Sequence, residues 1–266
     1  MANQIESGCF RRVVLLLVEG LGMGGELGSP PHGDGAHSLR HLSAYVGGVR
    51  MPFMQWLGLG NLVDVRGVPA VEPPAASLAV MGRRASGAGS ADGIREMFGS
   101  SLAAMVAQGI DVHAYGSVAH LFDDNEASVR DEDLPIQHMG ARLTEAASGL
   151  ARGLILAGVH LPRDRGPVAC ARALEQLDSQ IPLILDALDD SGLLLVSGTT
   201  GADPVMFAQE GFTREDVPLL AYTPAVASGV QLGRASSVAS VGATIAENFG
   251  VGGPVDCPSF YEPLLA

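Results

Sequence analysis

One carboxylate stands where a buried strand is expected to end. Residues 13–18, VVLLLV, form an unbroken apolar run, which is typical of a strand buried on both faces of a parallel sheet. Glu19 follows this run directly, and Gly20, Gly22 and Gly24 lie just beyond it. The carboxyl edge of such a sheet is where open α/β folds bind ligands. Glu19 is therefore a candidate functional residue, although an exposed glutamate in a tight turn would give the same pattern.

A second group of metal-ligating residue types lies in the glycine- and proline-rich segment 25–35 and just after it. These residues are His32, Asp34, His37 and His41. His37 and His41 would share one face of a helix, but no fixed ligand spacing joins them to Asp34. We therefore favour ordinary surface residues over a metal site here.

Further apolar runs alternate with segments of helical periodicity. Strands are expected at 61–65, 110–115, 153–159, 193–197 and 217–222. Helices are expected at 38–46, 52–57, 96–108, 141–151, 168–188 and 236–249, and Pro182 predicts a kink near 178–181. Segments 83–93 and 122–133 are expected to be loops. The alternation predicts a single α/β domain with a mostly parallel sheet and helices on both faces.

The composition narrows the classes of partner. The 266 residues are 47% hydrophobic, so a sizeable core can form, and the formal net charge is −13. An acidic surface repels phosphate backbones and anionic lipids, so we expect no nucleic-acid partner and no membrane partner. All 16 basic residues are arginines, which excludes lysine chemistry such as Schiff-base formation.

The cysteines and the apolar runs bear on location. Cys9, Cys170 and Cys257 are too few and too widely spaced for a disulfide framework or a zinc site. The apolar runs are too short for a membrane-spanning helix, and the N-terminus lacks the pattern of a signal peptide. These features predict a protein of the reducing cytoplasm.

Segments in both halves of the chain share the residue pattern of one enzyme family. They are VLLLVEGLGMG, GDGAHSLRHLS and MPFMQWLGLGNL in the first half, and ALEQLDSQIPLILDAL, GADP, FTREDVPLLAY and SVGATIAENFGV in the second. The pattern resembles the phosphopentomutases, which are members of the alkaline phosphatase superfamily and relatives of the cofactor-independent phosphoglycerate mutases. The resemblance implies an alkaline phosphatase-like core over residues 1–266. The middle is shorter than the family's cap domain, so we expect no full cap, only a remnant or insertion around 117–140.

The chemistry of that family implies two metal ions held by Asp and His, and a Thr or Ser that carries phosphate. The metal-binding Asp of the first strand falls on Glu19. The nucleophile region falls on residues 72–77, where Pro73 replaces the phosphate-carrying hydroxyl and Ser77 lies nearby. The remaining metal positions fall on residues poorly suited to divalent ions: Gly158, Arg163, Thr199, Thr200 and Phe212. A shift of the alignment does not restore them, because no His follows His160.

These replacements predict that no metal cofactor is bound. Hard divalent ions need several anionic or imidazole ligands, and Glu19 alone would hold one only weakly. A site for a small anion would remain, because guanidinium and hydroxyl groups suit phosphate or carboxylate. The candidate ligand-binding residues are Glu19, Ser77, Arg163, Thr199, Thr200, Thr213 and Arg214. For Arg214 a structural ion pair with Glu215 is an equal alternative, and Asp203 with Pro204 is expected to form a turn.

The retained family pattern and the lost ligands favour a catalytically degenerate phosphomutase-like protein. Such a pseudoenzyme would act by binding, as a regulatory, scaffold or assembly subunit. One alternative is a repurposed enzyme acting on a small phosphorylated or carboxylated metabolite, with Glu19 as the general base. Another is a metal-dependent phosphomutase or phosphatase that holds Mn or Mg through His113, His120, Asp123 and Asp124. An uncapped sheet edge also predicts a homo-oligomer or a protein partner.

Overall fold

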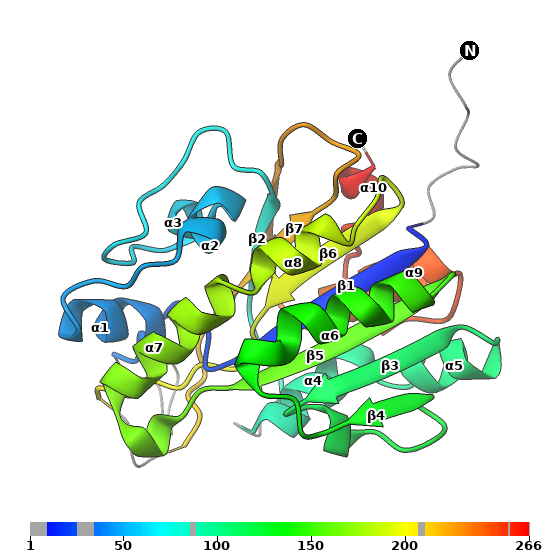
Figure 1. The fold of residues 1–266 in the computed structure, drawn as a ribbon, viewed down its shortest axis with the longest axis horizontal. Helices are drawn as coiled ribbons and strands as arrows, with labels where there is room; N and C mark the ends of the chain where they lie inside the picture. The colour runs from blue at the N-terminus through cyan, green and yellow to red at the C-terminus, as the bar shows by residue number, and fades with distance from the viewer. Residues whose placement is uncertain (1–9, 26–34, 86–88, 207–210, 255, 266) are drawn as a thin grey trace.

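The computed structural model describes residues 10–25, 35–85, 89–206, 211–254 and 256–265, and His32 and Asp34 lie outside this part of the chain. The described residues form an α/β fold around one mixed sheet (Figure 1). In spatial order its strands are β4 (Val129–Asp131), β3 (Asp111–Gly116), β5 (Gly153–His160), β1 (Arg12–Glu19), β6 (Gly192–Ser197), β7 (Val217–Tyr222), β2 (Ser77–Met81) and β8 (Gln231–Ala235). Among these strands only β7 runs antiparallel to its neighbours, which confirms the mostly parallel sheet.

β1 lies inside the sheet because both of its faces are apolar. All six residues from Val13 to Val18 are fully buried. β5 and β6 pair with β1 on either side, both in parallel, and the register sets Glu19 opposite His160. Because parallel strands end at the same edge, the last residues of β1, β5 and β6 meet at one place.

Helices cover both faces of the sheet, as expected. On one face Val14, Leu16 and Val18 share a core with α1 (Ser38–Tyr45), α2 (Pro52–Leu57), α3 (Leu59–Leu62), α6 (Ile136–Gly149), α7 (Pro167–Asp178) and α8 (Ile181–Asp186). On the other face Val13, Leu15 and Leu17 pack with α4 (Ser90–Phe98), α5 (Ser101–Ala107), α9 (Ala239–Phe249) and α10 (Tyr261–Leu264). Figure 1 shows α6, α7 and α8 in front of the sheet. In the described part of the chain no helix has the length and apolar character needed to cross a bilayer.

Several segments differ from the expectation drawn from the sequence. Residues 61–65 contain the end of α3 and not a strand. Segment 83–93 is not only a loop, because β2 leads into it and α4 begins at Ser90. Segment 122–133 contains the short edge strand β4, and the helix expected at 96–108 is divided between α4 and α5.

The helix expected at 168–188 is interrupted rather than kinked. α7 ends at Asp178, and α8 begins at Ile181 with Pro182 in its first turn. A proline is tolerated in the first turn of a helix because the N–H groups there have no intrahelical acceptor. The break therefore removes the clash that a proline inside one continuous helix would cause.

Candidate functional site

Glu19 and His160 form a hydrogen-bonded pair at the carboxyl edge of the sheet. The Glu19 side chain is only 6% exposed, and the Ser117 hydroxyl donates to its Oε1 at 2.5 Å. Nδ1 of His160 lies 3.3 Å from the other carboxylate oxygen, Oε2, while half of the imidazole remains exposed. A carboxylate that holds Nδ1 fixes the orientation of the ring and leaves Nε2 for another partner. This pair can hold and transfer a proton.

Sequence reasoning identified Glu19 but missed His160 and Ser117 as its partners. The strand expected at 153–159 ends one residue before His160, which is the last residue of β5. Pairing that strand in parallel with β1, end to end, would have placed His160 beside Glu19. Ser117 follows β3, the next strand outward from β5, so it reaches the same edge.

Arg163 and Phe212 meet beside this pair. The guanidinium of Arg163 lies 4.5 Å from the centroid of the Phe212 ring, and Nη1 donates to the carbonyl of Gly211. The Phe212 ring also packs edge-on against His160, with 6.1 Å between the ring centroids. Two positions that the family resemblance assigns to metal ligands therefore hold a stacked cation and aromatic ring.

The three threonines of the candidate set are buried and hydrogen-bonded within the protein. The Thr199 hydroxyl lies 3.2 Å from that of Ser90, the first residue of α4. Thr200 Oγ1 donates to the carbonyls of Gly201 and Thr213, each at 3.1 Å. Thr213 Oγ1 in turn donates to Glu215 at 2.5 Å. The structure assigns these hydroxyls to internal contacts rather than to an open surface.

Glu215 is a buried anchor for the loops at this edge. Its carboxylate accepts the backbone N–H groups of Gly24 and Ser38, both at 2.8 Å, and the hydroxyls of Ser38 and Thr213. Within the described residues it forms no ion pair with Arg214, so that alternative is not supported. The importance of Glu215 was not visible in the sequence, because its donors at Gly24 and Ser38 lie 191 and 177 residues away.

Asp203 forms the expected turn and also binds a histidine. Its Oδ1 accepts the backbone N–H groups of Val205 and Met206, and its Oδ2 lies 2.5 Å from Nδ1 of His41. Burial opposes ionisation, yet the hydrogen bonds from Met206, His37, His41 and Val205 lower the pKa of Asp203 below its usual value. His41 is thus a partner of a buried carboxylate and not an independent surface residue.

The structure does not bring Ser77 together with Glu19. Ser77 is the first residue of β2, which runs in the same direction as β1, so Ser77 lies at the opposite edge of the sheet from the last residue of β1. There its Oγ accepts the backbone N–H of Val230 at 3.1 Å. The residue assigned to the nucleophile region is therefore part of the pairing between β2 and the segment before β8.

The described residues at the positions that the family resemblance assigns to metal ligands do not fit two divalent ions. A Cβ atom on Gly158 would lie 2.4 Å from a Val118 methyl carbon and 2.7 Å from a backbone nitrogen, so a carboxylate side chain has no room there. In the part of the chain that the structure describes, no three His, Cys, Asp or Glu side chains are grouped as a metal site. This also applies to the alternative set His113, His120, Asp123 and Asp124, of which Asp124 instead pairs with Arg130.

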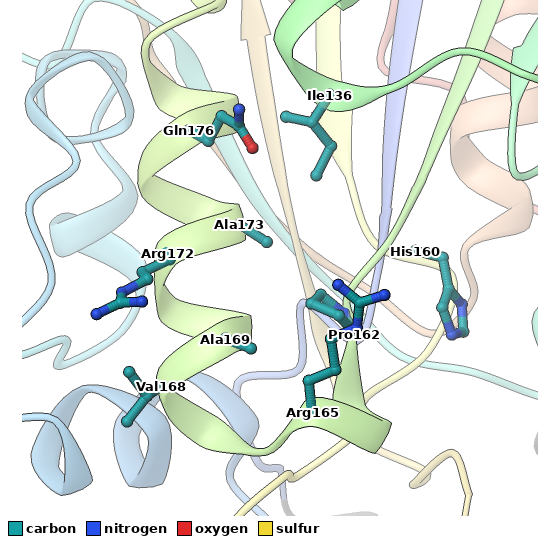
Figure 2. Close-up of a pocket in the computed structure, with 9 residues that line it drawn as sticks. All are labelled: Ile136, His160, Pro162, Arg165, Val168, Ala169, Arg172, Ala173 and Gln176. Atoms are coloured by element: carbon teal, nitrogen blue, oxygen red, sulfur yellow. The ribbon is translucent and has the colours of Figure 1, made fainter.

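An open groove of about 740 Å³ borders the Glu19–His160 pair. It is lined by Ile136, His160, Pro162, Arg165, Val168, Ala169, Arg172, Ala173 and Gln176. Figure 2 shows Arg165 rising from the turn before α7 between Ala169 and His160, whereas Arg172 points away from His160 on the other side of α7. The groove thus has an apolar wall with a guanidinium and an imidazole at one end.

Known proteins resemble this chain both in part of its sequence and in its fold. A family model described as Metalloenzyme superfamily matches residues 163–252, about a third of the chain. The fold is similar to that of the PH0037 protein from Pyrococcus horikoshii, with a TM-score of 0.57 and 13% identity over 91% of this chain and 97% of that one. It is also similar to a TAB5 alkaline phosphatase mutant with bound Mg, with a TM-score of 0.55 and 10% identity over 92% and 99%.

A Leishmania mexicana phosphoglycerate mutase is 15% identical over 60% of this chain, with a TM-score of 0.42, and this chain spans only 38% of its length. The stretch matched by the family model contains Arg163, Thr199, Thr200 and Phe212. The chain therefore has an α/β fold of the kind found in alkaline phosphatase, and its carboxyl-terminal part matches the metalloenzyme superfamily.

Proposed function

We propose that this chain is a phosphomutase-like protein without the two-metal centre of that family, and that it acts by binding. The observation that carries the proposal is the contact between Arg163 and Phe212, together with the lack of space at Gly158. The Arg163 guanidinium lies over Phe212, whose ring packs against His160, and a cation near this site repels a divalent ion while the ring offers it no ligand. A regulatory, scaffold or assembly subunit is the role that this site favours.

Metal titration tests the proposal directly. We expect Mn²⁺ or Mg²⁺ to bind without defined stoichiometry in calorimetry, and the purified chain to show no phosphatase or phosphopentomutase turnover when either ion is added. Glu19→Gln is the matched variant, because it removes the negative charge while the side chain keeps nearly the same size. Two tightly bound Mn²⁺ ions per chain, with turnover that Glu19→Gln abolishes, would overturn the proposal.

The hydrogen bond between Glu19 and His160 favours a second candidate, a metal-independent enzyme acting on a small phosphorylated or carboxylated metabolite. In this function the pair would move a proton, with the imidazole as the base and Glu19 holding its Nδ1. Turnover of such a metabolite in EDTA that is lost in both Glu19→Gln and His160→Gln would establish it. Turnover that survives both changes would exclude this pair as its source.

A binding role also needs a partner, and we propose self-association or a second protein. Exposed apolar side chains support this, among them Tyr45 at 62% and Trp56 at 45% exposure. Light scattering across a concentration series tests self-association. A mass of one chain at high concentration would leave only the protein partner.

A further inference from the structure

We propose that the groove beside α7 binds a small organic anion that carries a hydroxyl group next to its charge and an apolar body. Arg165 would hold the carboxylate or phosphate group, His160 would accept a hydrogen bond from the hydroxyl, and the wall of α7 would cover the apolar part. The inference deepens the proposed binding function by naming the place and the chemical class of the ligand. Of the ligand-binding residues predicted from the sequence, only Glu19 has a part in this site; the other residues of the site are new.

The charge of the groove is the first argument. The protein carries 29 acidic and 16 basic residues, yet no Asp or Glu lines the groove, and of its two arginines Arg165 is the one whose side chain lies toward His160. The Arg165 guanidinium forms no ion pair or side-chain hydrogen bond with any other described residue. An unpaired guanidinium at the mouth of a cavity offers planar donors that match a carboxylate or phosphate.

The position of Arg165 is the second argument. Arg165 ends the short 3-10 turn Arg163–Arg165, and Gly166 then leads into the first turn of α7. Figure 2 shows its guanidinium beside Pro162, between α7 and His160. Arg165 lies two residues before a 12-residue helix, and the partial positive charge at the N-terminal end of that helix adds to the charge of the guanidinium.

The imidazole supplies the specificity. Because Nδ1 of His160 faces the Glu19 carboxylate, the neutral ring presents Nε2 as a hydrogen-bond acceptor. An acceptor beside a guanidinium suits a ligand with a hydroxyl near its anionic group, such as a 2-hydroxy acid or a phosphate monoester that retains one proton. Glu19 does not touch the ligand in this arrangement and acts as a positioning residue.

Most of the other residues that line the groove are apolar. Ile136 from α6 and Ala169 and Ala173 from α7 face one another across it in Figure 2, with Pro162 between them and His160. Small side chains on α7 leave room for a ring or short alkyl chain, and burying such a group contributes to affinity in proportion to its apolar area. A ligand with an apolar body should therefore bind more tightly than inorganic phosphate.

The test measures mandelate binding by calorimetry in the presence of EDTA. Mandelate has a carboxylate, an adjacent hydroxyl and a phenyl ring, phenylacetate lacks the hydroxyl, and phenyl phosphate replaces the carboxylate. We expect saturable binding of mandelate, weaker binding of phenylacetate, and a loss of about tenfold or more in Arg165→Gln, since a charge-assisted hydrogen bond is removed. A preference for phenyl phosphate over mandelate would identify the phosphate ester as the ligand class.

Two further variants separate this site from general electrostatics. Arg172→Gln changes the net charge equally but alters a side chain that points away from His160, so mandelate affinity should stay within about twofold. His160→Phe should abolish the preference for mandelate over phenylacetate while Arg165 still binds both. No saturable binding, or an equal loss in Arg165→Gln and Arg172→Gln, would overturn the inference. Tight binding of two Mn²⁺ ions would contradict the proposed function, but it would not contradict anion binding in this groove.

Discussion

The guanidinium of Arg163 stacks 4.5 Å from the centroid of the Phe212 ring, at positions that the family resemblance assigns to metal ligands. We predict that the two side chains stabilise each other, with a coupling of about 0.5–1 kcal/mol, as is usual for a partly exposed cation–π contact. The measurement is a double-mutant cycle of Arg163→Gln and Phe212→Leu, followed by urea unfolding. Additive effects of the two changes would show that the contact contributes nothing.

Because the pKa of Asp178 is raised, we predict that the stability of the fold decreases as the pH rises. It is buried at the end of α7 and accepts the backbone N–H groups of Phe53 and Met54 at the start of α2. Burial raises its pKa, although these two hydrogen bonds oppose the shift. The folded state therefore keeps the proton to a higher pH than the unfolded state does, and stability decreases as the pH rises from 3.8 through the raised pKa.

Asp178→Asn tests this sign, because the amide stays neutral at every pH. The free energy of unfolding of the variant should improve relative to the natural protein between acid and neutral pH, whatever its absolute value. Urea unfolding at a series of pH values measures the difference. Parallel pH profiles for the two proteins would contradict the prediction.

Asp203 predicts the opposite dependence. Hydrogen bonds lower its pKa, so the stability it contributes is present above 3.8 and is lost as the pH falls through the lowered pKa. Asp203→Asn should therefore lower the free energy of unfolding most at neutral pH, and this loss should become smaller as the pH falls. His41→Gln should remove part of the same effect, because it replaces one of the donors to Asp203. A cost that does not change with pH would contradict this assignment.

The central strands of the sheet could be predicted because each is marked by an apolar run of consecutive residues. β1, β5 and β6 are apolar runs buried on both faces, and their first and last residues were expected to within about two positions. β2 and β8 escaped prediction because each has only five residues, which is too short a run to show a clear strand pattern. β8 in particular is mostly exposed and contains Gly233 and Arg234.

The candidate site was harder to predict because it depends on contacts between distant segments. Glu19 was found from its place at the end of an apolar run, whereas His160 becomes relevant only through a partner 141 residues away in the sequence. Ser77 was chosen by its closeness in sequence to the expected nucleophile region, but the direction of β2 places it at the far edge. Spacing along the chain does not contain the order and direction of the strands.

Among the carboxylates at this edge of the sheet, Glu215 is the one whose replacement should destabilise the fold most. Four donors converge on it from Gly24, Ser38 and Thr213, so the amide of Glu215→Gln can accept only part of them. A buried donor left without its acceptor costs about 1–3 kcal/mol, and we expect a loss in that range or above in urea unfolding. Glu247→Gln, at an exposed position on α9, is the matched control and should have little effect.

The same carboxylate explains why residue 201 is glycine. A Cβ atom at Gly201 would lie 2.2 Å from Oε1 of Glu215 and 2.6 Å from Oγ1 of Thr213. The Glu215 side chain cannot move aside without breaking its hydrogen bonds, so Gly201→Ala should destabilise the fold by about 1–3 kcal/mol, as overpacking does. Gly149→Ala is the control, because nothing lies within 4 Å of that Cβ position at the end of α6. Alanine there should be neutral or slightly stabilising, and an equal loss in both variants would show that Glu215 does not impose the requirement.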